Sequence, residues 1–136
     1  MYTNRFSFRI RYADTDQMGY AYYGNYAKYY EIGRVETIRS LGFSYRDFEK
    51  KLGIMLPVVH LESRYLKPAY YDDLLTVETQ IKEMPTKLIT FHCNIFNENE
   101  ELINTGVIKL FFVDMQTNKR VSAPILLTSK LNAYFD

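Results

Sequence analysis

The feature that most constrains the fold of this chain is a single long helical segment among several segments that alternate in polarity. From about Gly24 to Leu41, apolar residues recur at helical spacing, and Tyr26 and Tyr30 begin one continuous stripe. One amphipathic helix cannot bury its own apolar stripe, and a sheet that is apolar on one face also needs a cover. The pattern therefore predicts an α+β fold in which a five-stranded antiparallel sheet wraps around one long helix.

Five segments are predicted to be strands, and the first four alternate between apolar and polar residues with the period of two that is typical of a half-buried strand. These segments are residues 5–12, 58–65, 75–82, 89–95 and 101–114. The first places Tyr12 on its apolar side, and the last is almost continuously apolar from Val107 to Val113. Continuous apolarity indicates burial on both faces, and the edges of an open sheet need to be paired or covered. We therefore expect a homodimer.

The ends of the helical segments carry recognisable signals. Gly42 is a natural end for the long helix, and Ser44 is expected to cap a second, shorter helix that ends at Gly53. Residues 129–135 are expected to close the chain as a third helix. Three basic residues of the long helix lie off its apolar stripe and are expected to reach solvent: Lys28, Arg34 and Arg39.

Length and composition exclude several classes of protein. With 136 residues, of which 47% are hydrophobic, the chain fits one globular domain, residues 1–136. A formal charge of +1 provides no field that would favour nucleic acid or a membrane surface. The single Cys93 excludes an internal disulfide, and one Cys with two histidines is too few for a recognisable structural zinc site. We expect no metal and no cofactor. No apolar run approaches the roughly 18 residues of a spanning helix, and no signal-peptide core is present, so we expect the cytoplasm.

The candidate site for chemistry is the stretch Tyr12–Tyr26, which leads from the first strand into the long helix. It reads Tyr-Ala-Asp-Thr-Asp-Gln-Met-Gly-Tyr-Ala-Tyr-Tyr-Gly-Asn-Tyr and carries two carboxylates, Asp14 and Asp16. The first N–H groups of a helix have no acceptor within the helix, and the helix dipole adds positive potential there. Such N–H groups can stabilise an oxyanion beside a carboxylate that acts as a nucleophile or a base.

Two stretches of this chain resemble the hot-dog fold thioesterases of the 4-hydroxybenzoyl-CoA thioesterase family. One is Tyr12–Tyr26, and the other is Arg64–Val77, which reads Arg-Tyr-Leu-Lys-Pro-Ala-Tyr-Tyr-Asp-Asp-Leu-Leu-Thr-Val. The chain is also similar to the bacterial acyl-CoA thioesterases associated with the Tol–Pal system. The resemblance covers most of the chain and implies hydrolysis of an acyl- or aroyl-CoA thioester to the free acid and CoA. It also implies a homodimer or homotetramer with active sites built across the dimer interface.

The same resemblance implies roles for individual residues. Asp16 corresponds to the catalytic carboxylate, and the backbone N–H of Tyr23 corresponds to the oxyanion donor. The N–H of Gly24 stands beside it, and the missing Cβ allows a ligand to approach the backbone closely. Asp16 could attack the carbonyl to give a mixed anhydride or activate water as a general base, and the residues leave both routes open.

Other residues correspond to the substrate-binding parts of the family. The start of the first strand after the helix, Leu56-Pro57-Val58, corresponds to the acyl pocket. The turn whose basic residues contact the coenzyme phosphates in the family corresponds to Pro85-Thr86-Lys87, where Lys87 is the cation. The tyrosines of the loop are compatible both with an aromatic slot for the acyl group and with a dimer interface.

Each candidate also has a structural interpretation. Asp16 could satisfy loop amides or cap the helix, and Asp14 is expected to be structural. Glu31, midway along the helix, is expected to be supporting or solvated, and Cys93 to be a buried, inert thiol. Two alternative functions therefore stay open, an acyl-carrier-protein thioesterase and a non-catalytic acyl-binding module. A hot-dog dehydratase is disfavoured, because neither histidine lies in the loop motif.

Overall fold

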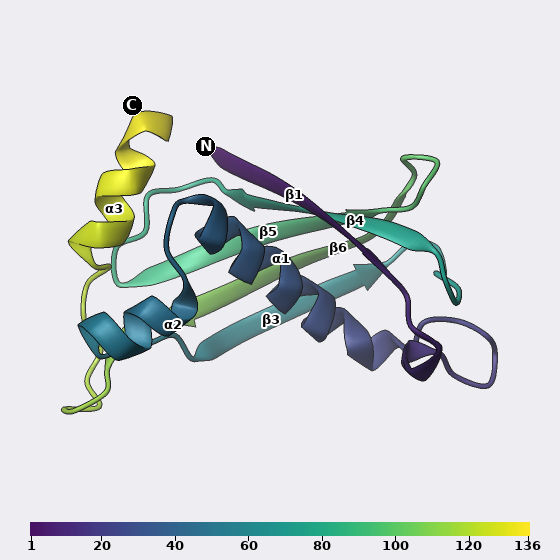
Figure 1. Ribbon diagram of the computed structural model, residues 1–136, viewed down its shortest axis with the longest axis horizontal. Coiled ribbons are helices and arrows are strands. Elements are labelled where there is room, and N and C mark those ends of the chain that lie inside the picture. The colour runs from purple at the N-terminus through teal and green to yellow at the C-terminus, as the bar shows by residue number, and fades with distance from the viewer.

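The computed structural model describes residues 1–136 and contains one five-stranded antiparallel sheet with a long helix across one face (Figure 1). The strands are β1 (Tyr2–Arg9), β3 (Val58–Tyr65), β4 (Leu74–Ile81), β5 (Leu88–Phe96) and β6 (Leu102–Phe111). Their order across the sheet is β1-β4-β5-β6-β3. A separate ribbon pairs β2 (Ile54–Met55) with β7 (Val113–Asp114). The predicted α+β architecture is confirmed.

The helical region matches its prediction closely, because the 3-10 turn η2 (Tyr23–Asn25) runs directly into α1 (Tyr26–Ser40). The shorter helices are η1 (Tyr12–Asp14), α2 (Tyr45–Asp47), η3 (Phe48–Leu52), α3 (Ile125–Leu131) and η4 (Asn132–Tyr134). The closing helix begins at Ile125 rather than at residue 129. Pro124 provides its N-terminal boundary, and its buried residues Leu127 and Leu131 face the core four positions apart. None of these helices is both long and apolar enough to cross a membrane.

The predicted signals at the ends of the first two helical segments are confirmed. Gly42 has a φ of 104° two residues after the last residue of α1, Ser40, a conformation that glycine adopts without steric cost. Ser44 caps α2, where its Oγ accepts a hydrogen bond from the N–H of Asp47 over 3.2 Å. Gly53 ends η3 in the left-handed conformation, with a φ of 65°.

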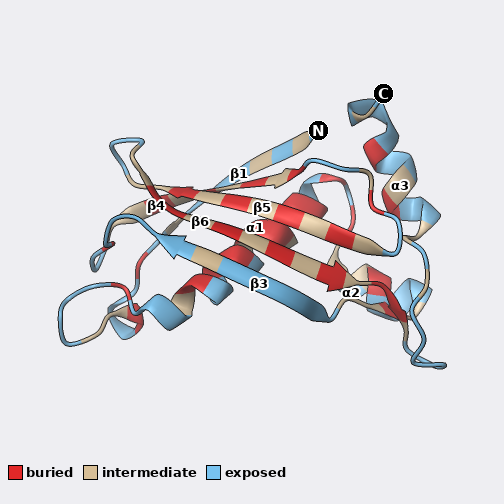
Figure 2. Cartoon of the chain, turned by 180° about the vertical axis from the view of Figure 1, so that it is seen from behind, coloured by how far each residue is buried: buried red, intermediate tan, exposed pale blue.

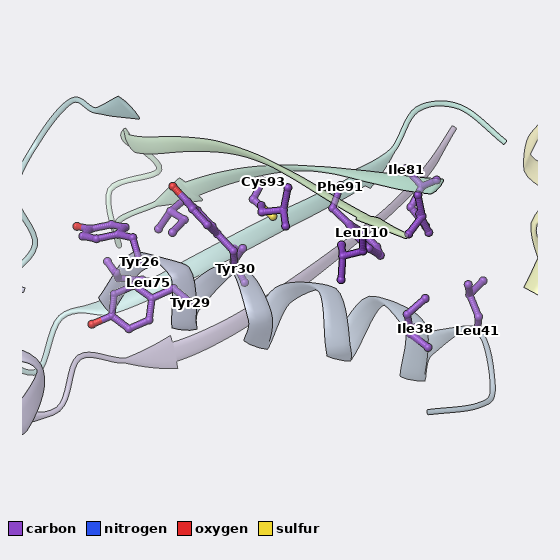
Figure 3. Packing of buried hydrophobic residues seen from close by; sticks show 14 of the residues in the cluster. Tyr26, Tyr29, Tyr30, Ile38, Leu41, Leu75, Ile81, Phe91, Cys93 and Leu110 are labelled. Atoms are coloured by element: carbon purple, nitrogen blue, oxygen red, sulfur yellow. The ribbon is translucent and has the colours of Figure 1, made fainter. Parts of the chain in front are cut away.

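The core lies between α1 and the inner face of the sheet. Figure 3 shows Tyr30 and Ile38 of α1 directed toward sheet residues such as Phe91 and Leu110, all of them buried. The helix lies close to β4 because Gly33 has no side chain: a Cβ there would lie 2.5 Å from Thr79 Oγ1. The apolar stripe of the long helix is therefore buried as expected.

Two expectations about single residues are wrong. Tyr12 is 78% exposed, because β1 ends at Arg9 and the chain turns into η1 before Tyr12 can continue the strand. Arg34 is only 8% exposed and does not reach solvent as expected. It lies one helical turn from both Tyr30 and Ile38, so it continues their buried row.

The exposed apolar surface also lies on a different strand from the one expected. Burial alternates along β6, and this strand lies inside the sheet between β5 and β3. The expectation that Val107–Val113 is buried on both faces is therefore wrong. The strand at the edge, β3, is exposed along most of its length (Figure 2). Val58 and Val59 are each 46% exposed and Leu61 is 43% exposed, so β3 carries an apolar surface at a free edge.

Candidate active site

The loop before the long helix is anchored by the buried carboxylate of Asp14. Lys28 Nζ lies 2.6 Å from Asp14 Oδ1, and Tyr29 OH and the N–H of Arg11 each lie 3.2 Å from Oδ2. Burial on its own would raise the pKa of this carboxyl. The hydrogen bonds and the Lys28 charge outweigh burial and hold the pKa below its ordinary value. Asp14 therefore has the structural role that we expected from the sequence.

The backbone of Asp14 ties the same loop to the start of the helix. Its carbonyl oxygen accepts the N–H of Tyr22 over 2.7 Å and the side-chain amide of Asn25 over 2.8 Å. Further along, the N–H of Asp16 donates to the carbonyl of Tyr20 over 2.9 Å. The loop therefore folds back on itself, and Asp16 is held beside the residues that lead into η2.

One oxygen of Asp16 is used by the loop and the other is free of protein partners. Oδ1 accepts hydrogen bonds from the N–H groups of Met18, over 2.9 Å, and Tyr20, over 3.3 Å. Oδ2 accepts no hydrogen bond from the protein. The side chain is half-buried. These contacts agree with the structural interpretation, in which Asp16 accepts hydrogen bonds from loop amides. They also fix the orientation of the carboxylate and leave one oxygen available.

The turn η2 presents the first N–H groups of the helical region. Its first hydrogen bond runs from the N–H of Asn25 to the carbonyl of Tyr22 over 2.9 Å. The N–H groups of Tyr23 and Gly24 come before that bond and have no acceptor within the turn. The ring of Tyr22 packs against Gly24, where an added Cβ would lie 2.6 Å from Tyr22 Cε2.

A cavity of about 290 Å³ lies between this loop, the start of the helix and the end of β3. Its walls are mostly apolar and aromatic, and Asp16 is its carboxylate. The lining residues are Asp16, Met18, Tyr20, Ala21, Tyr23, Tyr26, Tyr65, Leu66, Lys67 and Pro68. Burial of Tyr26, one of these lining residues, raises the pKa of its phenol to about 12.

The cavity brings together some of the candidate residues and not others. Asp16 and Tyr23 line it, while Gly24 is adjacent in sequence and does not. The segment Leu56–Val58 lies at the opposite end of β3 from Tyr65. Lys87 lies at that same distant end, because the next residue, Leu88, pairs with Phe111, whose N–H donates to Pro57. Within one copy of the chain, these segments are outside the cavity.

The wall formed by residues 65–68 was not among the candidate site residues. The signal for it was present, because these residues belong to the second stretch of family resemblance. The structure joins the two stretches directly: the N–H of Ala21 donates to the carbonyl of Ala69 over 2.7 Å, and Tyr20 pairs with Tyr70. Lys67 lines the cavity while its Nζ pairs with Glu101.

Other reactive side chains lie away from this cavity. Cys93 is buried beneath α1, and burial raises the pKa of its thiol to about 12, as expected for an inert cysteine. His60 and His92 lie on strands and do not line the cavity. Glu31 is exposed on the helix and has no ion-pair partner, in agreement with a solvated role.

Comparison with known proteins decides the family. The model of the thioesterase superfamily matches residues 18–104, well over half of the chain. The chain belongs to the thioesterase superfamily. Among the relatives of this thioesterase, YneP of Bacillus subtilis is 35% identical over 121 residues, which cover 89% of this chain and 87% of YneP. The acyl-CoA thioesterase YbgC of Haemophilus influenzae is 32% identical over 126 residues, which cover 91% of this chain and 92% of YbgC.

Solved structures of other thioesterases have the same fold. The DHNA-CoA thioesterase from Staphylococcus aureus superposes with a TM-score of 0.85 at 36% sequence identity, covering 99% of this chain and 85% of the other. The hot-dog fold that the two sequence stretches implied is therefore confirmed, and so is the expectation that the chain is an enzyme of the thioesterase class.

Proposed function

We propose that this thioesterase hydrolyses an acyl- or aroyl-CoA thioester to the free acid and coenzyme A. The observation that carries the proposal is that Asp16, whose Oδ2 has no protein partner, and Tyr23, the first residue of η2, line the same mostly apolar cavity. Its relatives include an acyl-CoA thioesterase and a DHNA-CoA thioesterase, which support the substrate class. Both proteins match this chain over most of its length.

In the proposed reaction, the thioester carbonyl lies between Asp16 and the N–H groups of Tyr23 and Gly24. Asp16 either attacks the carbonyl carbon or takes a proton from a water that attacks it. The carbonyl oxygen becomes an oxyanion, which the two N–H groups stabilise. Collapse of the tetrahedral intermediate breaks the C–S bond and releases the CoA thiolate. Loss of one such donor typically costs about 2.7–4 kcal/mol of barrier.

A panel of acyl- and aroyl-CoA thioesters, assayed with a thiol-reactive dye, tests this proposal. We expect Asp16→Asn to lower kcat by about 10²- to 10⁴-fold. The matched control is Asp72→Asn, because Asp72 is exposed and its left-handed backbone tolerates asparagine. Unchanged turnover in Asp16→Asn would exclude Asp16 as the catalytic carboxylate. Faster turnover of an acyl-carrier-protein thioester would change the substrate class, and stabilisation by ligand without thiol release would indicate a binding module.

Single turnover in H₂¹⁸O tests whether Asp16 is the nucleophile. If Asp16 is the nucleophile and water attacks the Asp16 carbonyl of the anhydride, ¹⁸O enters the Asp16 carboxylate. If Asp16 activates water, or if water attacks the acyl carbonyl of the anhydride, ¹⁸O enters only the product acid. Mass spectrometry of the peptide that contains Asp16 detects this label, and its presence establishes the nucleophilic role.

We propose that the active enzyme is a homodimer formed through the free edge of β3. This edge strand has unpaired backbone groups and the exposed apolar residues Val58, Val59 and Leu61. Antiparallel pairing of two such edges would bring the Leu56–Val58 end of one strand beside the Tyr65 end of the other. The acyl-pocket segment of one copy would then adjoin the cavity of its partner, and a tetramer would combine two such dimers.

Sedimentation equilibrium tests the dimer. We expect Leu61→Lys to shift the protein toward monomer and to lower activity, because the charge would lie in the apolar interface. Ile125→Lys is the control, since Ile125 is exposed on α3 and is not part of the β3 edge. A wild-type protein that stays monomeric at micromolar concentration would contradict the proposal.

The same dimer gives Lys87 a role in holding the coenzyme. Lys87 lies at the Pro57 end of the sheet, so it would approach the cavity of the second copy together with Leu56–Val58. We expect Lys87→Gln to raise KM for CoA thioesters and to leave kcat nearly unchanged. An equal increase in KM for a thioester that lacks the coenzyme phosphates would contradict this role.

A further inference from the structure

Tyr65 closes the cavity from the sheet side and contacts the start of the helix. Its hydroxyl donates a hydrogen bond to the backbone carbonyl oxygen of Tyr23 over 3.2 Å. Its ring stands edge-on to the rings of Tyr23 and Tyr26, with centroids 6.2 and 5.2 Å away. Because Tyr65 is the last residue of β3, this contact joins the edge of the sheet directly to η2.

The carbonyl oxygen of Tyr23 and the N–H of Gly24 belong to one planar peptide group. In a trans peptide these two groups point in opposite directions, so a donor held on the oxygen also fixes the direction of the N–H. A hydrogen bond to the oxygen polarises the peptide and makes its N–H a stronger donor. The same oxygen also accepts the N–H of Tyr26, which aligns this peptide with the axis of α1.

We infer that Tyr65 is a positioning residue for the oxyanion hole of this thioesterase. The inference rests on the proposed function, in which the N–H groups of Tyr23 and Gly24 bind the oxyanion. The Tyr65 hydroxyl acts on the peptide from its carbonyl side, and the ring of Tyr22 packs against Gly24. Since the hydroxyl is already bonded to the protein, its contribution falls on the rate of the chemical step rather than on substrate binding.

Steady-state kinetics of Tyr65→Phe test the inference, because this change removes only the hydroxyl and keeps the ring. We expect kcat to fall about three- to tenfold, as for the loss of one ordinary hydrogen bond, while KM stays within about twofold. Tyr71→Phe is the control, since Tyr71 is exposed, lies outside the cavity and makes no side-chain hydrogen bond. It should match the wild-type enzyme in both constants.

A second measurement reports on the peptide group between Tyr23 and Gly24. The ¹⁵N resonance of Gly24 responds to hydrogen bonding at the carbonyl of the same peptide group. We expect this resonance to move in Tyr65→Phe and to stay in place in Tyr71→Phe, with the thermal unfolding midpoint of Tyr65→Phe close to that of the wild type. A purely structural role for Tyr65 would instead lower the midpoint and spread shifts over many resonances.

The outcomes separate the inference from the proposed function. If the wild-type enzyme releases no thiol from any thioester, the proposed function fails and the inference fails with it. If the wild type is active and Tyr65→Phe keeps its kcat, the inference alone is overturned. A fall in kcat with an unmoved Gly24 resonance also overturns it, whereas a fall in kcat with a moved resonance supports it.

Discussion

The side-chain amide of Asn25 donates a hydrogen bond to the backbone carbonyl oxygen of Asp14 over 2.8 Å. This bond spans the loop that contains Asp16 and connects its first part to the last residue before α1. The N–H of Tyr22 donates to the same oxygen. The position of Asp16 relative to the start of the helix is therefore held by bonds that involve neither the Asp16 carboxylate nor the cavity.

We predict that Asn25→Ala lowers kcat clearly while it lowers the free energy of unfolding only modestly. Removing the amide leaves one bond to the Asp14 carbonyl, so the free energy of unfolding should fall by only about 0.5–1.5 kcal/mol. The loop would then be less well fixed, and a small displacement of a catalytic group is costly for the rate. Urea unfolding and thioester kinetics measure the two effects. A loss of stability with unchanged kcat would contradict this account of the loop.

Asp14 should make the protein sensitive to acid. Its carboxyl has a lower pKa in the folded protein than in the unfolded chain, so the ionised form favours the folded state. This stabilisation is present above the unfolded pKa, about 4, and is lost as the pH falls through the lower folded value. In Asp14→Asn we expect a smaller loss of stability between neutral and acidic pH than in wild type. Unfolding midpoints measured from pH 7 to 2 test this, with Asp72→Asn as the control that should follow the wild-type curve.

The hydroxyl of Tyr30 belongs to a cluster of hydrogen-bonded polar side chains beneath the helix, and its removal should destabilise the fold. It bonds to Ser63 Oγ at 2.5 Å and to Asn104 Oδ1, and Asn104 is completely buried. In Tyr30→Phe the amide oxygen of Asn104 loses this donor, which we expect to cost about 1–3 kcal/mol in the free energy of unfolding. Chemical denaturation measures it. Tyr134→Phe, at an exposed tyrosine, should change stability by less than about 0.5 kcal/mol.

Gly33 should not tolerate a side chain. A Cβ at this position would lie 2.5 Å from Thr79 Oγ1 and 2.8 Å from a methyl group of Val77, so α1 would have to move away from β4. Although alanine favours helix, we expect Gly33→Ala to destabilise the protein by about 1–3 kcal/mol because the core is overpacked. Thermal unfolding measures the change. Glu31→Ala, at an exposed position of the same helix, is the control, and an increase in stability for Gly33→Ala would show that the helix can move freely.

The periodic features of this protein could be predicted from its sequence alone. The helix from residue 24 to 41 and the strands β4 and β5 follow from spacing, because local backbone geometry decides which side chains share a face. The helix signals at Gly42, Ser44 and Gly53 are also local, since each depends on the conformation of one or two residues. The two motifs around Asp16 and Tyr65 were sufficient to indicate the family.

Only the tertiary structure decided the features that depend on which helices and strands lie next to each other. The order β1-β4-β5-β6-β3 leaves β3 at an edge and β6 inside, and no property of either segment alone specifies that order. Arg34 is buried because it shares a row with Tyr30 and Ile38 in the packed helix, although its charge favours solvent. The wall of residues 65–68 lies at the cavity through long-range contacts, such as the bond from the N–H of Ala21 to the carbonyl of Ala69 and that from the Tyr65 hydroxyl to the carbonyl of Tyr23. Such long-range contacts bring together segments that are distant in sequence, and local spacing carries no information about them.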